Sequence, residues 1–85
     1  MKTANFVIRN LSKAASNARE QIFHNGLAIL WSYETPVAVL TRGEYLRTST
    51  DYSRTTTRHI KDWIGEAKAR KVEQSLINKL AGLKK

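Results

Sequence analysis

The chain has 85 residues, of which 15 are Lys or Arg and 7 are Asp or Glu, so its formal net charge at pH 7 is +8. This length suffices for one domain with a modest core, and we treat residues 1–85 as that domain. Because the chain has no cysteine and only two histidines, we expect neither a disulfide scaffold nor a thiolate nucleophile, and no metal or other cofactor. The basic excess favours anionic partners, although solubility alone is a common reason for such charge.

The N-terminal residues have the pattern of a short strand, and residues 11–26 fit two different structures. Residues 6–8 predict a short edge strand. Residues 11–26 carry apolar side chains at helical spacing and end on a glycine, which is typical of an amphipathic helix. The Asn-Gly pair at 25–26, however, lies between two apolar runs and predicts a two-residue type I′ hairpin turn with Ile22 opposite Ile29. We favour the hairpin.

Three further segments predict the strands of an antiparallel meander. Residues 27–33 are apolar and aromatic, and residues 37–40 are apolar throughout. We expect Pro36 to separate these two strands, because proline cannot donate the hydrogen bond that a central strand requires. Residues 44–47 alternate polar and apolar side chains, as a half-exposed edge strand does.

The C-terminal part of the chain predicts one long helix. Residues 48–57 are rich in hydroxyl side chains, which favour loops and helix caps, so we expect the helix to begin between Thr55 and Arg58. No proline interrupts it, and Gly65 is its weak point. The expected fold is therefore α+β, a small antiparallel β-meander of three to four strands packed against a long C-terminal helix whose tail, 65–85, is basic and amphipathic.

This long helix would carry two apolar stripes, about 170° apart when residues are placed at 100° per step. The first stripe would cover the sheet. The second would face away from it, so we expect at least a homodimer held together by the second stripe. Alternatively, the chain bends at Gly65 and folds the tail onto its own sheet. The first stripe consists of Ile60, Trp63, Ile64 and Ala67, and the second of Ala69 and the self-association residues Val72, Leu76, Leu80 and Leu83.

Two sequence blocks carry a family resemblance. Residues 31–39 read W-S-Y-E-T-P-V-A-V, and residues 51–59 read D-Y-S-R-T-T-T-R-H. Their S-Y-x-T-P-x-A and Y-S-x-T-T-x-x-H patterns resemble a small domain of unknown function that is widespread in phages, plasmids and other mobile elements. The resemblance covers about residues 18–64. It implies a strand–turn–strand followed by the start of a helix, and a location in the cytoplasm of a bacterial or archaeal host, but it implies no reaction.

His59, in the first turn of the expected helix, has three competing roles. We favour a structural hydrogen bond to the sheet, for example to Tyr33 or Tyr52. A second role is to bind an anion at the helix N-terminus together with neighbouring arginines. General-base catalysis would need a nucleophile and an orienting group nearby, and the sequence shows no such pair, so we expect no enzymatic activity.

These features favour a protein that acts by binding. We expect weak, sequence-indifferent contact with the nucleic-acid backbone, because the helix has a basic sector and the chain has no helix-turn-helix, RRM or zinc-finger pattern. The alternative is a protein-level inhibitor of host defence or nucleic-acid-processing machinery, similar to an anti-CRISPR protein, that docks on an acidic host protein surface. A merely solvated helix would show the same charge segregation. We expect no membrane partner. The candidate nucleic-acid or anion-binding residues are Arg54, Arg58, His59, Lys61 and Lys68, with Arg42 and Arg47 contributing from the sheet edge.

Overall fold

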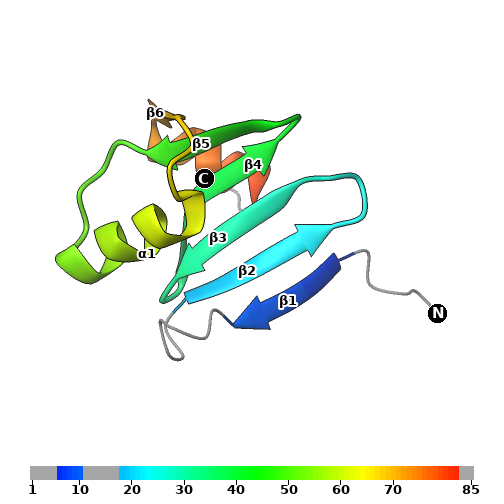
Figure 1. Ribbon diagram of the computed structural model, residues 1–85, viewed down its shortest axis with the longest axis horizontal. Coiled ribbons are helices and arrows are strands. Elements are labelled where there is room, and N and C mark those ends of the chain that lie inside the picture. Colours follow the sequence, from blue (N-terminus) through cyan, green and yellow to red (C-terminus); the bar gives the residue numbers. More distant parts are fainter. Residues whose placement is uncertain (1–5, 11–17, 83–85) are drawn as a thin grey trace.

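The computed structural model describes residues 6–10 and 18–82 and contains one mixed sheet flanked by two short helices (Figure 1). The expected edge strand at 6–8 is confirmed as the first strand. In chain order the elements are β1 (Phe6–Asn10), β2 (Ala18–Phe23), β3 (Ala28–Ser32), β4 (Thr35–Thr41), β5 (Glu44–Thr48), α1 (Arg54–Ile64), β6 (Ala69–Val72) and α2 (Gln74–Leu80).

The six strands lie in the sheet in the same order as in the chain. Strands β1 to β5 form an antiparallel meander, and the turns that join β2 to β3, β3 to β4 and β4 to β5 are short. Strand β6 instead runs parallel to β5, and α1 makes the crossover between them. A parallel neighbour requires such a crossover, because a short turn cannot return the chain to the same end of the sheet.

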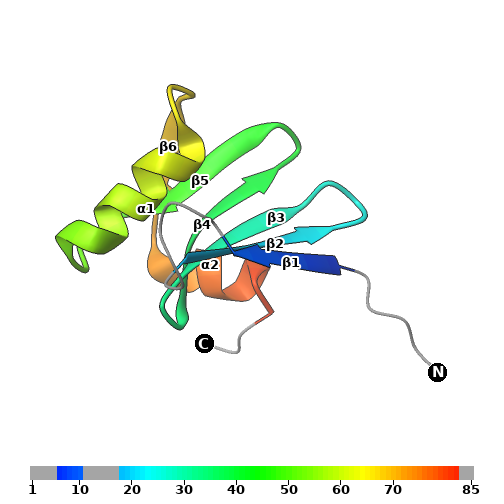
Figure 2. The same cartoon turned by 60° about the horizontal axis from the view of Figure 1, so that its bottom comes forward.

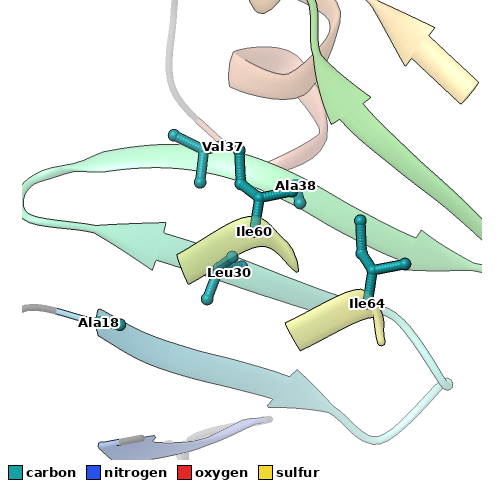
Figure 3. Packing of buried hydrophobic residues seen from close by; sticks show 6 residues of the cluster. All are labelled: Ala18, Leu30, Val37, Ala38, Ile60 and Ile64. Carbon is teal, nitrogen blue, oxygen red and sulfur yellow. The ribbon is translucent and has the colours of Figure 1, made fainter. Parts of the chain in front are cut away.

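The helices cover opposite faces of the sheet (Figure 2). Successive residues of a strand point to opposite faces, so Leu30 packs towards α1 while its neighbour Ile29 packs towards α2. Figure 3 shows Ile60 and Ile64 of α1 lying over β3 and β4. The α1-side core consists of Ala18, Leu30, Val37, Ala38, Ile60 and Ile64, and the α2-side core consists of Ile29, Val39, Leu46 and Ile77.

Trp63 completes the packing of α1 on the sheet, as the first apolar stripe predicts. Its ring packs edge-on against Tyr45, with centroids 5.5 Å apart and planes at 85°. Its indole Nε1 donates a hydrogen bond of 2.7 Å to Oε1 of Glu20. Ala67, the last residue of that stripe, lies beyond the helix and is exposed.

The long C-terminal helix is the main error of the sequence analysis. Helix α1 ends at Ile64 because Gly65 adopts φ 69° and its N–H bonds to the carbonyl of Lys61, a conformation that glycine reaches without a Cβ clash. The chain then turns back, and residues 69–72 extend the sheet beside β5 instead of continuing the helix. The final helix has only seven residues. The fold is therefore a six-stranded mixed sheet with two short helices, and the bend at Gly65 was the better alternative.

The expected self-association stripe is divided by this change. Val72 lies in β6 and Leu80 in α2, and both pack on the α2-side core around Ile77. Leu76 is 39 % exposed in α2, and Leu83 lies outside the described residues. Because Val72 lies in a strand and Leu80 packs on the core, these side chains do not form one continuous exposed helical stripe, and a dimer seam loses its geometric basis. Homodimerisation stays a prediction.

Residues 11–26 fitted either a helix or a hairpin, and the favoured hairpin is confirmed as β2–β3. The first part of this segment, residues 11–17, lies outside the described residues. The turn of the hairpin is one residue longer than expected. The N–H of Phe23 bonds to the carbonyl of Leu27 at 2.8 Å, enclosing residues 24–26, and Gly26 has φ 93°. A three-residue loop with a glycine in this region is the common alternative to a two-residue turn.

The longer turn shifts the hairpin register by one residue. Ile22 pairs with Ala28 and Gln21 pairs with Ile29, whereas the sequence analysis paired Ile22 with Ile29. A one-residue shift exchanges which residues share a face of the sheet. Ile29 therefore lies on the α2 side of the sheet and Ile22 does not share that face.

Pro36 lies inside β4 and does not separate two strands. Leu30 pairs with Ala38 while Trp31 pairs with Pro36, so Val37 is an extra residue that forms a β-bulge. A bulge interrupts the hydrogen-bond ladder, which is why a central strand can accept a proline there. Because of the bulge, Val37 and Ala38 are both buried in the α1-side core.

Candidate nucleic-acid interface

Three cations form a line along the outer side of α1. Ser53 caps the helix, since its Oγ accepts a hydrogen bond of 3.2 Å from the N–H of Thr56, and the helix begins at Arg54. Arg54, Arg58 and Lys61 are four and three residues apart, so they share one side of the helix, and all three are exposed. We call them the α1 stripe. The opposite side of the helix carries its buried residues Thr56, His59, Ile60 and Ile64.

The N-terminal end of the α1 stripe is hollowed. Arg54, Thr55 and Arg58 line a depression of about 260 Å³. It lies at the first turn of α1, where backbone N–H groups have no helical partner and the helix dipole is positive. Two guanidinium groups and this helix end together suit an anionic group such as a phosphate.

The C-terminal end of the α1 stripe opens into a second, more strongly basic site. Lys61 lines a cavity of about 210 Å³ together with Arg47 of β5 and Lys71 of β6. Arg47 and Lys71 are partners in the parallel β5–β6 register, which places both side chains on the α1 side of the sheet. We call this site the basic cavity. It is lined by Arg47, Lys61, Ile64, Gly65, Ala67, Ala69 and Lys71.

The five cations of the α1 stripe and the basic cavity lack anionic partners within the described chain. None of them forms an ion pair with another described residue, and the exposed pair of Arg70 with Glu44, at 3.7 Å, involves neither site. Lys61 belongs to both sites, so the cations form one connected surface built from α1, β5 and β6. Such a surface attracts polyanions and can neutralise several phosphates at once.

Comparison with known proteins gives a family but no activity. A sequence model of a family of unknown function, DUF8033, matches residues 2–79. The chain belongs to this family. No curated protein and no solved structure matches it. The DUF8033 match extends beyond the region of resemblance at 18–64 and includes β6 and most of α2, the elements that the sequence analysis read as a helical tail.

The structure of this DUF8033 chain separates the remaining candidate residues from the connected basic surface. Lys68 is exposed in the loop between α1 and β6 but does not line the cavity. Arg42 lies in the β4–β5 turn, which is far from α1 in both Figure 1 and Figure 2. Lys71 was not predicted as a site residue. It becomes a neighbour of Arg47 only because residues 69–72 form strand β6 beside β5, and no sequence signal predicted that strand.

His59 faces the sheet and not the solvent. It is 3 % exposed, and its Nδ1 lies 2.8 Å from the Oγ of Ser32 in β3. The same Oγ lies 3.0 Å from Oγ1 of Thr56, and the Tyr33 ring centroid is 6.0 Å from that of His59. The two motif blocks of this DUF8033 chain thus meet in a buried hydrogen-bond network. Ser32 is 2 % exposed, which favours the expected structural role and leaves a substrate little access to its hydroxyl.

Replacing Ser32 with alanine should destabilise the fold by about 1–3 kcal/mol, because it leaves buried polar atoms of Thr56 and His59 without a shared partner. The measurement is urea unfolding followed by circular dichroism. Ser75→Ala is the matched control, because Ser75 is exposed on α2 and should change stability by less than about 0.5 kcal/mol. Equal stability of the two variants would contradict a structural role for the network.

Proposed function

We propose that this protein binds the phosphate backbone of nucleic acids through the α1 stripe and the adjoining basic cavity. The observation that carries the proposal is the connected set of five cations from three elements, none of which pairs with a carboxylate of the described chain. Cations without partners can neutralise phosphates and thereby release the counterions that are condensed on the nucleic acid. This release supplies most of the free energy of non-specific binding.

The dimensions of the α1 stripe fit a backbone. Seven residues separate Arg54 from Lys61, which corresponds to about 10 Å along a helix. One strand of duplex DNA rises about 3.4 Å per phosphate along the duplex axis, and neighbouring phosphates lie further apart than this along the backbone, so the stripe can contact about two to three phosphates.

We also propose that the protein acts as an accessory protein of a phage or other mobile element in the cytoplasm of a bacterial or archaeal host. The two motif blocks around Ser32 and His59 support this context, since they resemble a domain found in such elements. No helix in the described part of the chain is long and apolar enough to cross a bilayer.

Fluorescence anisotropy with labelled duplex and single-stranded oligonucleotides tests the proposal. At about 150 mM salt we expect a dissociation constant of about 10⁻⁴–10⁻⁶ M, independent of base sequence, and at about 50 mM salt binding should be at least about tenfold tighter. Between about 50 and 200 mM salt, the log–log slope for duplex should be about −2.7 if the three stripe cations contact phosphates, and about −4.5 if all five cations do. Absence of binding at about 50 mM salt, or a slope near zero, would refute backbone binding and favour an acidic host protein as the partner.

A further inference from the structure

The basic cavity holds three cations in an arrangement that is unfavourable when the cavity is empty. Arg47 and Lys71 lie side by side on neighbouring strands, and Lys61 lines the same cavity from α1. Like charges on adjacent strand positions repel each other and destabilise a sheet. None of the three pairs with a carboxylate of residues 6–10 or 18–82, so this part of the chain supplies no compensating charge.

The buried Nε of Arg47, which lines the cavity, also favours an anion in it. The Nε of Arg47 is buried and has no hydrogen-bond partner among the described residues. A buried donor without a partner is uncommon in folded proteins and costs free energy. An anion in the cavity would compensate the three positive charges and would bring acceptor oxygens close to the Arg47 guanidinium.

We propose that the basic cavity binds the terminal phosphate of a nucleic-acid strand. This inference rests on the proposed function, because it assumes that a strand follows the α1 stripe. Lys61 belongs to both sites, so a backbone that follows Arg54 and Arg58 reaches the cavity at Lys61.

Size and charge favour a strand end over an internal phosphate. The cavity volume of about 210 Å³ lies below the range of about 300–1,000 Å³ that is usual for whole small-molecule ligands, so it suits a single group. A terminal phosphomonoester carries about −1.5 to −2 charges at pH 7, whereas each internal phosphodiester carries −1. Three cations therefore favour the monoester. Gly65 and Ala67 line the cavity from the loop after α1.

The experiment compares oligonucleotides of one sequence that carry a phosphate or a hydroxyl at the 5′ end, with the fluorophore at the 3′ end, and a second pair with the ends exchanged. We expect the wild-type protein to bind one phosphorylated form about tenfold more tightly than its hydroxyl counterpart, the size of one strong charge-assisted contact. Lys71→Gln should bring this ratio close to one, because it weakens binding of the phosphorylated form more than binding of the hydroxyl form, which loses at most one backbone contact. Lys71 is exposed, so the substitution should not perturb the fold.

Arg58→Gln is the matched control, because Arg58 belongs to the α1 stripe and not to the cavity. It should weaken binding of both forms alike and leave the ratio unchanged. Binding of both forms with a ratio of one in the wild type would overturn the terminal-phosphate site but not backbone binding, whereas no binding of either form would refute both. Inorganic phosphate is the final probe: weak competition supports a strand end, and binding as tight as that of the oligonucleotide would show that free phosphate is the ligand and overturn the proposal.

Discussion

Replacing Ile77 with alanine is expected to lower the free energy of unfolding by about 2–5 kcal/mol. The Ile77 side chain is completely buried and packs with Ile29, Val39 and Leu46 on the α2 side of the sheet. Helix α2 has seven residues and would not be stable alone, so it depends on this contact. Removing three carbon atoms would leave a cavity under the helix, and chemical denaturation with urea would measure the resulting loss.

Leu76→Ala is the matched control for Ile77→Ala, since the two residues are neighbours in the same helix. Leu76 is 39 % exposed, so its truncation should cost less than about 1 kcal/mol. This contrast also distinguishes the short α2 from a long helix with Leu76 and Leu80 in a seam. If Leu76→Ala destabilised the protein as much as Ile77→Ala, the packing of α2 described above would be incorrect.

The sequence predicted those parts of the fold that depend on local signals. The meander over β2 to β5 follows from apolar runs separated by turns. Hydroxyl side chains predicted the start of α1 only approximately, because the expected start lay between Thr55 and Arg58 and the helix begins at Arg54, directly after its cap Ser53. Residues 69–72 contain Ala, Arg and Lys, which favour helices in isolation. They form β6 because the exposed edge of β5 offers backbone partners, and a parallel pairing across α1 has no local signature. Tertiary pairing thus outweighed helix propensity.

The same distinction applies to the candidate site. The sequence named Arg54, Arg58 and Lys61 as candidates, but it grouped Arg58 and Lys61 with Lys68 on one long helix, and Lys68 lies in the loop after α1. The basic cavity depends on the non-local neighbours Arg47 and Lys71, and no sequence pattern brings them together. The burial of His59 depends on Ser32, which is far away in the chain and becomes its neighbour only when α1 packs on β3.

Reversing two charges of the α1 stripe, Arg58→Glu with Lys61→Glu, is expected to weaken nucleic-acid binding by roughly 30- to 700-fold at about 50 mM salt. Dissociation constants of about 10⁻⁴–10⁻⁶ M correspond to about 5–8 kcal/mol, or at least about 1 kcal/mol for each of five phosphate contacts, and the double variant removes two contacts and adds two repulsions. The total is about 2–4 kcal/mol. The salt slope should become shallower by about 2, and the thermal unfolding midpoint should change little because both side chains are exposed.

The control for this variant is Arg42→Glu with Lys79→Glu. Each substitution changes the charge by −2, so both double variants lower the net charge from +8 to +4. Arg42 lies in the β4–β5 turn and Lys79 in α2, on the other side of the sheet from α1. We expect this control to bind within about fivefold of the wild type, because only unspecific long-range attraction is lost. Equal losses in both variants would mean that net charge and not the α1 stripe governs binding.

Backbone binding by the outer side of α1 is tested most directly by mapping amide chemical shifts of the ¹⁵N-labelled protein during addition of a short duplex at about 50 mM salt, a concentration at which the electrostatic contribution is large. We predict that the shift changes concentrate on α1 between Arg54 and Lys61 and on β6 around Lys71, while α2 and the β4–β5 turn change little. The shift changes on α1 and β6 should disappear as the salt concentration is raised. Shift changes confined to α2 or to β1 and β2, or no changes at all, would contradict this assignment.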